Sequence, residues 1–501
     1  MRSSIVYTRY LLLLMAGALF PLGFSPFDYS PVSGLSIALA FLLTRTSDLK
    51  SSAINGFIFG AGLFGAGVSW VYVSIHEFGA ASLPLAGFLT LLFVVVISLL
   101  LIMPPFALYG WLSQRKDKLP PWQQALIFSA LWVVFEWVRS WLFTGFPWLI
   151  TGYSLLDTPF QSLAPVTGVY GLSLMMTLTG CLLAATLIPE QRKTAIILTL
   201  VSLIPWGLAI PLENIQWTKK TGQLEFSVIQ GNIPQDLKWD PGFIQTTINT
   251  YTNLTANQWS KDLVIWPENA IPVLYNQARG FVDQLDREAK SNASTLIMGI
   301  PIDDNSGDKT RYYNGILALG QGSGRYDKQK LVPFGEYIPL ESVLRGLIDF
   351  FDLPMSDFTK GKENQALLKA GDTLITPYIC YEVVYPDFAA KMARNSGLLL
   401  TISNDTWFGD SLGPVQHFQM ARMRALETDR YLIRATNDGI SALINNKGKV
   451  LETIPRFQKG VLSGTAVTVS GTTPFMQFGS WPVLLLCLLL VAISLLSKRR
   501  S

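Results

Sequence analysis

Long apolar stretches alternate with short polar connections in the amino-terminal part of the chain, and one more apolar stretch follows near its end. They occupy residues 9–24, 32–44, 54–75, 84–112, 123–143, 166–188, 194–211 and 480–497. A membrane-spanning helix needs about 20 predominantly apolar residues, and about 17 are tolerated. The pattern therefore predicts eight spanning helices, with the short second one accepted as half of a hairpin with the first. The first stretch also has the form of a signal peptide, since Arg2 and Arg9 precede its apolar core, but the stretches that follow favour a retained anchor.

The connections between these stretches predict an orientation, because cytoplasmic loops carry an excess of Lys and Arg. Basic residues fall on every second connection: before the first stretch, in 45–53, 113–122 and 189–193, and in the tail 498–500. The connections 25–31, 76–83 and 144–165 contain none. Both termini are therefore expected in the cytoplasm. The chain is expected to divide into a seven-helix transmembrane bundle (1–212), an outer domain (213–478), and a last spanning helix with a basic tail (479–501).

The outer segment 213–478 has another pattern, in which short β-branched runs alternate with amphipathic stretches. This alternation is typical of a layered α/β or α+β domain. Strands are expected at 224–229, 263–266, 295–300, 315–319, 374–379, 398–403, 433–436 and 441–444. Helices are expected at 242–258, 280–289, 387–395 and 415–428, and a turn at 303–309.

Composition agrees with a chain that faces water only in part. Half of the 501 residues are hydrophobic and 15% are charged, against about a quarter charged in ordinary soluble proteins. The net charge of +4 gives no reason to expect nucleic acid. Three cysteines do not make a disulfide framework, and Cys181 and Cys487 lie in apolar stretches. Cys380 is therefore the one thiol in the polar segment.

Three residues that follow expected strands carry the candidate chemistry: Glu268, Lys328 and Cys380. Functional side chains gather at strand ends in layered α/β proteins. A thiol is nucleophilic as its thiolate, which a nearby cation favours. A carboxylate can remove the thiol proton and later return it to a leaving group. Lysine can stabilise the oxyanion of a tetrahedral intermediate alongside backbone N–H groups. The three residues therefore provide a base, an electrostatic partner and a nucleophile for acyl transfer.

Motifs around these residues resemble a known family. They are Gln230-Gly231-Asn232-Ile233-Pro234-Gln235 with Trp239, Trp266-Pro267-Glu268, Lys328 with Leu331-Val332-Pro333-Phe334-Gly335-Glu336, Ile379-Cys380-Tyr381-Glu382, and Asn404-Asp405-Thr406-Trp407-Phe408. Together they resemble the nitrilase (carbon-nitrogen hydrolase) superfamily, whose catalytic set is Glu-Lys-Cys, and more closely the apolipoprotein N-acyltransferase family. The resemblance covers nearly the whole chain. By composition Lys330 competes for the lysine role, but the spacing of the family to Pro-Phe-Gly-Glu selects Lys328.

The resemblance implies a fold and a reaction. The fold would be the αββα sandwich of nitrilases joined to a multi-span membrane bundle. Cys380 would take an acyl chain from a phospholipid, typically phosphatidylethanolamine, as a thioester. The amine of an S-diacylglyceryl cysteine on an apolipoprotein would accept it, giving a triacylated lipoprotein. The chemistry requires no metal and no organic cofactor, and we expect a monomer whose catalytic domain is periplasmic.

The resemblance also implies a role for each site residue. Glu268 would be the general base and Lys328 would stabilise the oxyanion. Glu336 and Glu382 would support the lysine and the cysteine. Trp239 and Tyr381 would line the site.

Other features have two interpretations. Glu136 and Arg139, three apart in an expected span, favour a mutual ion pair over contact with a phospholipid head group. The apolar-rich stretch 343–355 is either a core helix or, as we favour, a lid that meets acyl chains. Gly409–Gly413 fits the G-x-S-x-G hydrolase elbow, but His417 stands too close to Ser411 in sequence for that mechanism.

Three rival functions remain open at this point. A membrane-tethered amidase or nitrilase would pass the same thioester to water, although one span would suffice as its tether. A transporter with an outer binding domain would need polar residues within its spans, and few are present. An inactive scaffold that binds lipoproteins would not need the intact Glu-Lys-Cys set.

Overall fold

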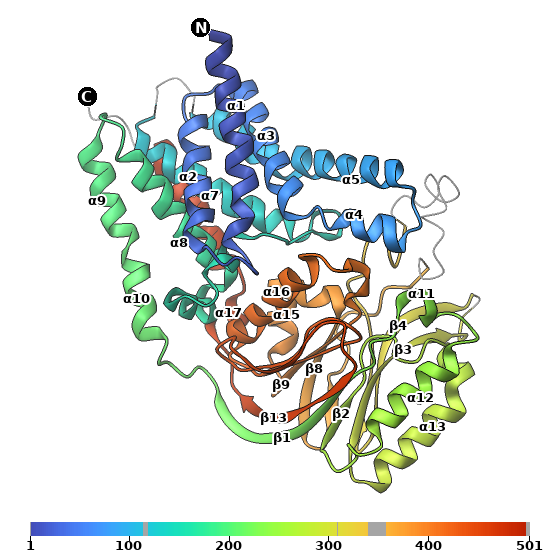
Figure 1. Ribbon diagram of the computed structural model, residues 1–501. Coiled ribbons are helices and arrows are strands. Elements are labelled where there is room, and N and C mark those ends of the chain that lie inside the picture. The colour runs from blue at the N-terminus through green and yellow to red at the C-terminus, as the bar shows by residue number, and fades with distance from the viewer. Residues whose placement is uncertain (1, 114–118, 308, 339–356, 497–501) are drawn as a thin grey trace. The chain divides into compact units, whose positions relative to one another are not determined.

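The chain folds into two compact units in a computed structural model that describes residues 2–113, 119–307, 309–338 and 357–496. The first, called here the helical unit, comprises Met1–Tyr72, Ser82–Ile215 and Phe478–Ser501. The second, called the sheet unit, comprises Val73–Ala81 and Gln216–Gln477. Figure 1 shows that the helical unit consists of helices and connecting turns and that the sheet unit holds all of the strands.

The helical unit consists of apolar helices joined by short connections. Its longer helices are α1 (Arg2–Leu19), α2 (Ser30–Thr44), α3 (Leu49–Gly67), α5 (Leu83–Ile97), α6 (Met103–Ser113), α7 (Pro121–Arg139), α8 (Ala164–Ala185), α9 (Arg192–Ser202), α10 (Ile204–Leu212) and α18 (Trp481–Leu496). Proline begins α7 at Pro121, where its missing N–H leaves no helical hydrogen bond unmade. The helix α1 packs on α3, and α7 packs on α8 and α18.

The expected eight spans are not confirmed. Four helical segments are long and apolar enough to cross a membrane: Ile5–Gly23, Leu83–Ser113, Pro159–Ala185 and Arg192–Leu212. A fifth is counted if the bent pair Leu49–Gly67 and Val71–Phe78 forms one span, while α2 and α18 are apolar but shorter. The helix α7 is not among these candidates, and its two glutamines and its Glu136 and Arg139 lower its hydropathy.

The expected third span, 54–75, was wrong as one continuous helix. The helix α3 ends at Gly67, because Val68 leaves helical backbone angles (φ −132°, ψ 19°). The following helical segment Val71–Phe78 is bent from α3 by 63°. Within the sheet unit, to which Val73–Ala81 belongs, the Ser74 hydroxyl donates to the Trp407 carbonyl at 2.6 Å. One apolar run therefore contributes residues to both units, and its hydrophobicity alone does not show where the division falls.

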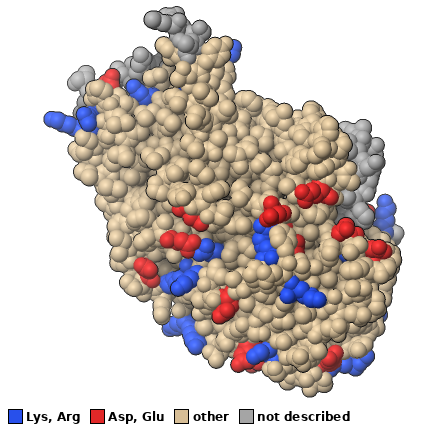
Figure 2. All heavy atoms as spheres, viewed as in Figure 1, with Lys and Arg blue, Asp and Glu red and all other residues tan. Residues whose placement is uncertain are grey.

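The surface of the helical unit is apolar. Large aliphatic side chains stand exposed along several helices, among them Leu91 on α5 (63% exposed) and Leu200 on α9 (62% exposed). On the face seen in Figure 2, charged side chains are almost absent from the helices and gather over the sheet unit. An apolar surface of this extent disfavours exposure to water and is typical of contact with lipid or another apolar partner.

The sheet unit contains two mixed sheets. The first has the order β13 (Gly460–Ser470), β1 (Lys219–Gln230), β2 (Leu263–Ile265), β3 (Thr295–Asp304), β4 (Arg311–Gly320) and β6 (Arg325–Asp327). The second has the order β12 (Val450–Ile454), β11 (Ser441–Ile444), β10 (Leu432–Thr436), β9 (Leu398–Ser403), β8 (Thr373–Ile379), β7 (Leu368–Ala370) and β5 (Gly322–Ser323). The central strands β8, β9 and β10 run parallel.

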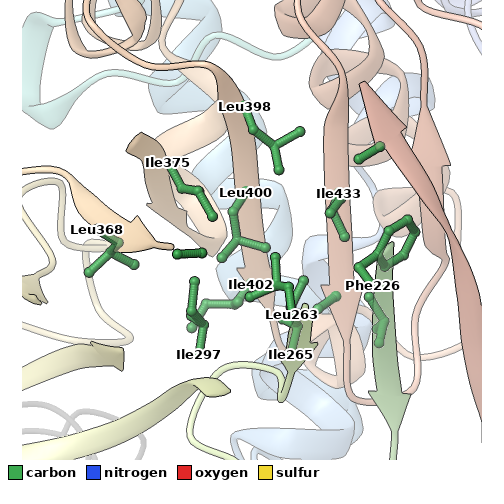
Figure 3. Packing of buried hydrophobic residues seen from close by; sticks show 14 of the residues in the cluster. Phe226, Leu263, Ile265, Ile297, Leu368, Ile375, Leu398, Leu400, Ile402 and Ile433 are labelled. Carbon is green, nitrogen blue, oxygen red and sulfur yellow. The ribbon is translucent and has the colours of Figure 1, made fainter. Parts of the chain in front are cut away.

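Helices cover the outer faces of the two sheets, and the core lies between the sheets. The helices α12 (Ile244–Thr255) and α13 (Tyr275–Ser291) pack on the first sheet, and α15 (Pro386–Ala393) and α16 (Gly413–Thr428) pack on the second. Figure 3 shows Phe226 and Ile265 of the first sheet facing the same core as Leu400 and Ile433 of the second. Each such buried side chain contributes about 1.5–3 kcal/mol to stability. The layers therefore follow the αββα order that the resemblance implies.

Secondary structure in the sheet unit agrees well with the expectation from the sequence. Every expected strand and all four expected helices are present, and the strands 398–403 and 441–444 have the expected bounds. The strands β5, β6, β7, β12 and β13 were missed. The turn expected at 303–309 falls where β3 and β4 form a hairpin. The lid expected at 343–355 lies outside the described residues.

Candidate active site

Polar residues follow strands at one end of the sandwich. Glu268 follows β2, Lys328 follows β6, and Cys380 and Asn404 follow β8 and β9. The backbone N–H of Asn404 donates to Glu268 Oε2 at 2.8 Å, which joins the end of the second sheet to the end of the first. Lys328 Nζ lies 3.6 Å from Glu268 Oε1. The two sheets thus bring together residues that are far apart in the sequence.

Glu268 is buried among hydrogen-bond donors. Its side chain is held from two sides, because Asn314 Nδ2 donates to Oε1 at 2.7 Å and the Asn404 backbone donates to Oε2. Burial raises the pKa of the Glu268 carboxyl, and the positive charge of Lys328 opposes the shift. A carboxylate with a raised pKa is a stronger base, so this residue is suited to accept a proton near neutral pH.

Lys328 is buried between two carboxylates. Its Nζ lies 2.8 Å from Glu336, which also accepts hydrogen bonds from Asn314 Nδ2 and from the Val332 backbone. Burial disfavours the charged lysine, but the carboxylates of Glu336 and Glu268 outweigh it and raise the pKa of Lys328. The ammonium group therefore stays charged and fixed in a site from which water is largely excluded, where its field acts strongly.

Cys380 begins the short helical turn η8 (Cys380–Val384) directly after β8. Its backbone has φ +50°, a left-handed conformation that is unfavourable for residues other than glycine. Burial, together with the negative charge of Glu268, raises the pKa of the Cys380 thiol to about 12, while Lys328 acts in the opposite direction. The resting thiol is therefore protonated, and a base must remove its proton as it attacks.

Glu382 ties the lysine-bearing loop to the cysteine turn. Its Oε2 accepts from the Ile379 backbone at 2.8 Å, and its Oε1 accepts from the Gln329 backbone at 2.6 Å and from the Tyr326 hydroxyl at 2.9 Å. The side chain is fully buried. Burial raises the pKa of Glu382 to about 7 against these hydrogen bonds. One carboxylate thus fixes the residue before Cys380 and the residue after Lys328.

The two aromatic residues expected at the site have different surroundings. Tyr381 follows Cys380, is 8% exposed, and its ring packs edge-on against Tyr385 with centroids 5.4 Å apart. Trp239 is half-buried at the end of α11 (Gln235–Lys238), and its indole nitrogen has no hydrogen-bond partner among the described residues. Its neighbour Lys238 donates from Nζ to the Glu268 carbonyl at 3.1 Å. This hydrogen bond places the end of α11 close to Glu268.

Lys328 and Lys330, the two candidates for the lysine role at the site, have different surroundings. Lys330 Nζ lies 5.4 Å from the ring centre of Tyr385 and 5.7 Å from that of Phe388, and is only half-buried. Lys328, by contrast, is 1% exposed and contacts both Glu268 and Glu336. The position of Lys328 agrees with the lysine that the family spacing selects.

The serine elbow does not form. Ser411 accepts a hydrogen bond from the Gly413 backbone at 3.2 Å. His417 lies on α16, and its ring nitrogens face the Cys380 carbonyl on one side and Asp405 and Arg434 on the other. Since the nitrogens face these groups, the histidine is not placed as a base for Ser411.

The mutual ion pair expected between Glu136 and Arg139 is also not found. Glu136 accepts hydrogen bonds from Trp132 and Thr151, and Arg139 donates to the Leu149 carbonyl at 3.2 Å. Among the described residues no contact of ion-pair length joins the two side chains, although both are buried. Backbone and side-chain groups of the 149–151 segment compete successfully for both residues.

Sequence reasoning missed several polar residues of the site. Asn314 was placed next to an expected apolar strand and Lys238 next to Trp239, but neither was assigned a role. An amide directly before an apolar run, as in Tyr313-Asn314-Gly315-Ile316, is the signal that could have found Asn314. Within the described parts of the chain, no group of three or more His, Cys, Asp or Glu is arranged to hold a metal ion.

Comparison with known proteins gives matches along the whole chain. Residues 16–182 match the family described as "Apolipoprotein N-acyltransferase N-terminal domain", and residues 227–471 match the family "Carbon-nitrogen hydrolase". The apolipoprotein N-acyltransferase of Pseudomonas paraeruginosa is 47% identical over 496 residues, which cover 98% of this chain and 96% of that protein. That of Azotobacter vinelandii is 47% identical over 493 residues (98% and 95%), and that of Methylococcus capsulatus is 40% identical over 496 residues (98% and 96%).

Proposed function

The chain belongs to the apolipoprotein N-acyltransferase family, and we propose that it moves an acyl chain from a phospholipid to the amine of a lipoprotein through a thioester on Cys380. The proposal rests on one observation. A chain that is 47% identical to an apolipoprotein N-acyltransferase over 98% of its length also brings Glu268 and Lys328 together beside Cys380. The typical donor is phosphatidylethanolamine. The acceptor is the α-amine of an S-diacylglyceryl cysteine at the start of an apolipoprotein.

In the first half-reaction, Cys380 forms the thioester. Its sulfur attacks the ester carbonyl carbon of the phospholipid while Glu268 takes the thiol proton, as the raised pKa values of both groups favour a coupled transfer. The charge of Lys328 stabilises the oxyanion of the tetrahedral intermediate. The carbon–oxygen bond then breaks, Glu268 returns the proton to the glycerol oxygen, and a lysophospholipid leaves.

In the second half-reaction, the lipoprotein amine attacks the thioester carbon. Glu268 accepts a proton from the amine, and Lys328 again stabilises the oxyanion. The carbon–sulfur bond breaks, the thiolate of Cys380 regains a proton, and the acyl chain remains on the amine as an amide. The enzyme returns to its starting state, so the two substrates react in alternation in a ping-pong sequence.

The supporting residues have roles that follow from their contacts. Glu336 contacts Lys328 at 2.8 Å and holds its ammonium group in place. Glu382 fixes the backbone on either side of the lysine and cysteine positions. Tyr381 and Trp239 would line the site, and the indole N–H of Trp239 has no hydrogen-bond partner among the described residues.

The proposed setting is the cytoplasmic membrane of a bacterium. Residues 1–212 would form seven helices of an eight-span arrangement, and 479–501 would provide the last helix and a cytoplasmic tail. Basic residues on alternate connections support cytoplasmic termini and a periplasmic domain at 213–478. The exposed aliphatic side chains of the helical unit support burial in lipid. A single copy of the chain holds the complete Glu-Lys-Cys set, in keeping with a monomer.

The nearest rival is a hydrolase with the same thioester chemistry, and the fate of the acyl chain tests the choice. The purified protein is incubated with phosphatidylethanolamine and a diacylglyceryl-cysteine peptide, with Cys380→Ala as the blank. We expect lysophospholipid and N-acylated peptide in equal amounts. Free fatty acid in place of acylated peptide would establish the hydrolase, and the absence of both products would contradict acyl transfer from this donor.

A further inference from the structure

A second group of buried ionisable residues lies behind the cysteine turn, and the proposed reaction does not use it. It consists of Asp405 in the turn η9 (Asp405–Phe408), His417 on α16 and Arg434 on β10. Each of the three side chains is at most 2% exposed. His417 links this group to the cysteine turn through a contact of 3.2 Å between its Nε2 and the carbonyl oxygen of Cys380.

The contacts determine which ring nitrogen carries the hydrogen. A carbonyl oxygen only accepts, so Nε2 of His417 must donate to Cys380. The other nitrogen, Nδ1, lies 3.1 Å from Arg434 Nη2, which only donates. It also lies 3.2 Å from Asp405 Oδ1, which would attract a second ring proton. Burial and the charge of Arg434 lower the pKa of His417, so the neutral ring is favoured, with Nδ1 as an acceptor.

Asp405 completes the arrangement by holding the arginine. Arg434 Nη2 donates to Asp405 Oδ2 at 2.7 Å, and the Ser403 hydroxyl donates to Oδ1 at 2.7 Å. Burial disfavours the carboxylate, but the positive charge of Arg434 lowers the pKa of Asp405 below its usual range. A permanent ion pair therefore orients the imidazole, and the imidazole in turn holds the Cys380 carbonyl.

The Cys380 carbonyl matters because of the peptide group to which it belongs. That group joins Cys380 to Tyr381 and is planar, so the direction of its carbonyl also fixes the direction of the Tyr381 N–H. In the serine nucleophile elbow, which also presents its nucleophile directly after a strand, the N–H of the following residue is an oxyanion donor. The left-handed backbone of Cys380 is unfavourable by itself and persists only if surrounding contacts hold it.

We propose that His417, oriented by Asp405 and Arg434, is a positioning residue that sets the 380–381 peptide group so that its N–H and the Cys380 thiol face the same acyl carbonyl. It touches no substrate atom and transfers no proton. Its expected contribution is to the attack of the thiol on an acyl group, not to the reactivity of the thiol itself. Burial, Glu268, Lys328 and Asp405 set the pKa of the thiol, and each of them remains in a variant at His417.

This division gives the test, which compares two reactions of the same cysteine in the full-length protein. One is thioester formation from phosphatidylethanolamine, followed by intact mass spectrometry in a single turnover. The other is alkylation by iodoacetamide, which forms no tetrahedral oxyanion. In His417→Leu, thioester formation should fall by about 10–100-fold, somewhat less than the loss of an oxyanion donor itself. Alkylation should change by no more than about twofold, because this reaction forms no oxyanion that the peptide N–H could stabilise.

Two further variants separate positioning from folding. His417→Gln keeps an N–H donor near the position of Nε2 and should recover part of the lost acylation rate. Thr428→Val removes another buried polar group at the far end of α16, about 16 Å along the helix. It should leave both reactions unchanged at a comparable loss of thermal stability.

The outcomes distinguish this inference, which rests on the proposed function, from the function itself. Absence of a thioester in the wild type overturns both. A wild-type thioester with equal acylation in His417→Leu overturns the positioning role alone. Parallel loss of acylation and alkylation, or no recovery in His417→Gln, also overturns it in favour of a purely structural histidine.

Discussion

The helical unit and the sheet unit place ionisable side chains in opposite ways. In the helical unit, Glu136 and Arg139 are buried near one another, yet the hydrogen bonds that each makes go to neutral partners of the same unit. In the sheet unit, Glu268 and Lys328 lie 3.6 Å apart, and Asn314 and the Asn404 backbone fix the carboxylate. The helical unit also exposes its aliphatic side chains, whereas the sheet unit encloses them between two sheets.

The difference shows that burial of a charge does not by itself indicate catalysis. A buried carboxylate becomes a useful base when a cation and a nucleophile share its pocket and when strand ends hold all three rigidly. Glu268 meets these conditions through its coupling to Lys328 and Cys380. Glu136 lies within a helix and not at a strand end, and its contacts are those of a residue that joins α7 to the 149–151 segment.

Replacement of the two buried glutamates by glutamine should separate these cases most strongly. Glu268→Gln keeps the shape of the side chain but removes the base, so thioester formation should fall by about 10²–10⁴-fold. Glu136→Gln should leave the rate of thioester formation nearly unchanged. The measurement is the initial rate of Cys380 acylation by intact mass spectrometry. Equal losses in the two variants would show that the contrast between the units is mistaken.

Charges introduced on exposed leucines test the contrast in surroundings. Leu91 on α5 is 63% exposed in the helical unit, and Leu451 on β12 is 43% exposed in the sheet unit. Leu91→Arg should destabilise membrane insertion by about 2.5–3.5 kcal/mol if the residue faces lipid. Leu451→Arg should change stability by no more than about 0.5 kcal/mol. The share of each variant recovered in the membrane fraction gives the result, and equal recovery would contradict lipid contact at Leu91.

Glu382 offers a smaller effect within the sheet unit. The Glu382 carboxylate accepts hydrogen bonds from the backbone N–H groups of Ile379 and Gln329. In Glu382→Gln, the side-chain NH2 group would face one of these N–H groups, so one of the two hydrogen bonds would be lost. The resulting shift between the lysine loop and the cysteine turn should slow thioester formation by up to about 10²-fold. Glu225→Gln, at an exposed ion pair with Lys261, is the matched control and should have no measurable effect. A wild-type rate in Glu382→Gln would show that the two segments do not depend on this contact.

The pH dependence of acylation should reveal the environment of Glu268. The active form of a base is deprotonated, so the rate must fall as the pH drops through its pKa. Since burial raises the pKa of Glu268, this fall should begin above the ordinary glutamate value of 4.5. Single-turnover rates from pH 8 to the acid limit of folding, about pH 5, measure it. A rate that does not fall within this range would contradict a buried base with a raised pKa.

Much of the sheet unit could be predicted because its strands are short apolar runs with clear ends. The bounds of β9 and β11 follow from such runs, and Cys380 and Glu268 were expected next to strands for the same reason. The strand β13 was missed because glycine, serine and threonine occupy many of its positions. Its backbone is held as a strand by pairing with β1 along eleven residues, not by an apolar pattern of its own.

Contacts between distant segments could not be predicted from local patterns. No periodic pattern in the sequence predicts the hydrogen bond between the Asn404 backbone and Glu268, which are 136 residues apart. The hydrogen bond between Ser74 and Trp407, which are 333 residues apart, is equally unpredictable. The spanning helices show the same limit. Hydrophobicity gave stretches of the right length, but the bend after Gly67 depends on local backbone angles and on which unit the next residues join.

The most direct test of the account is the mass of the intact protein after incubation with phosphatidylethanolamine, compared with Cys380→Ser and Cys380→Ala. We predict an acyl adduct on wild-type Cys380 that hydroxylamine removes and that a diacylglyceryl-cysteine peptide discharges much faster than water does. Neither variant should carry a hydroxylamine-sensitive adduct. A folded, lipid-bound wild-type protein without any adduct would contradict the thioester mechanism.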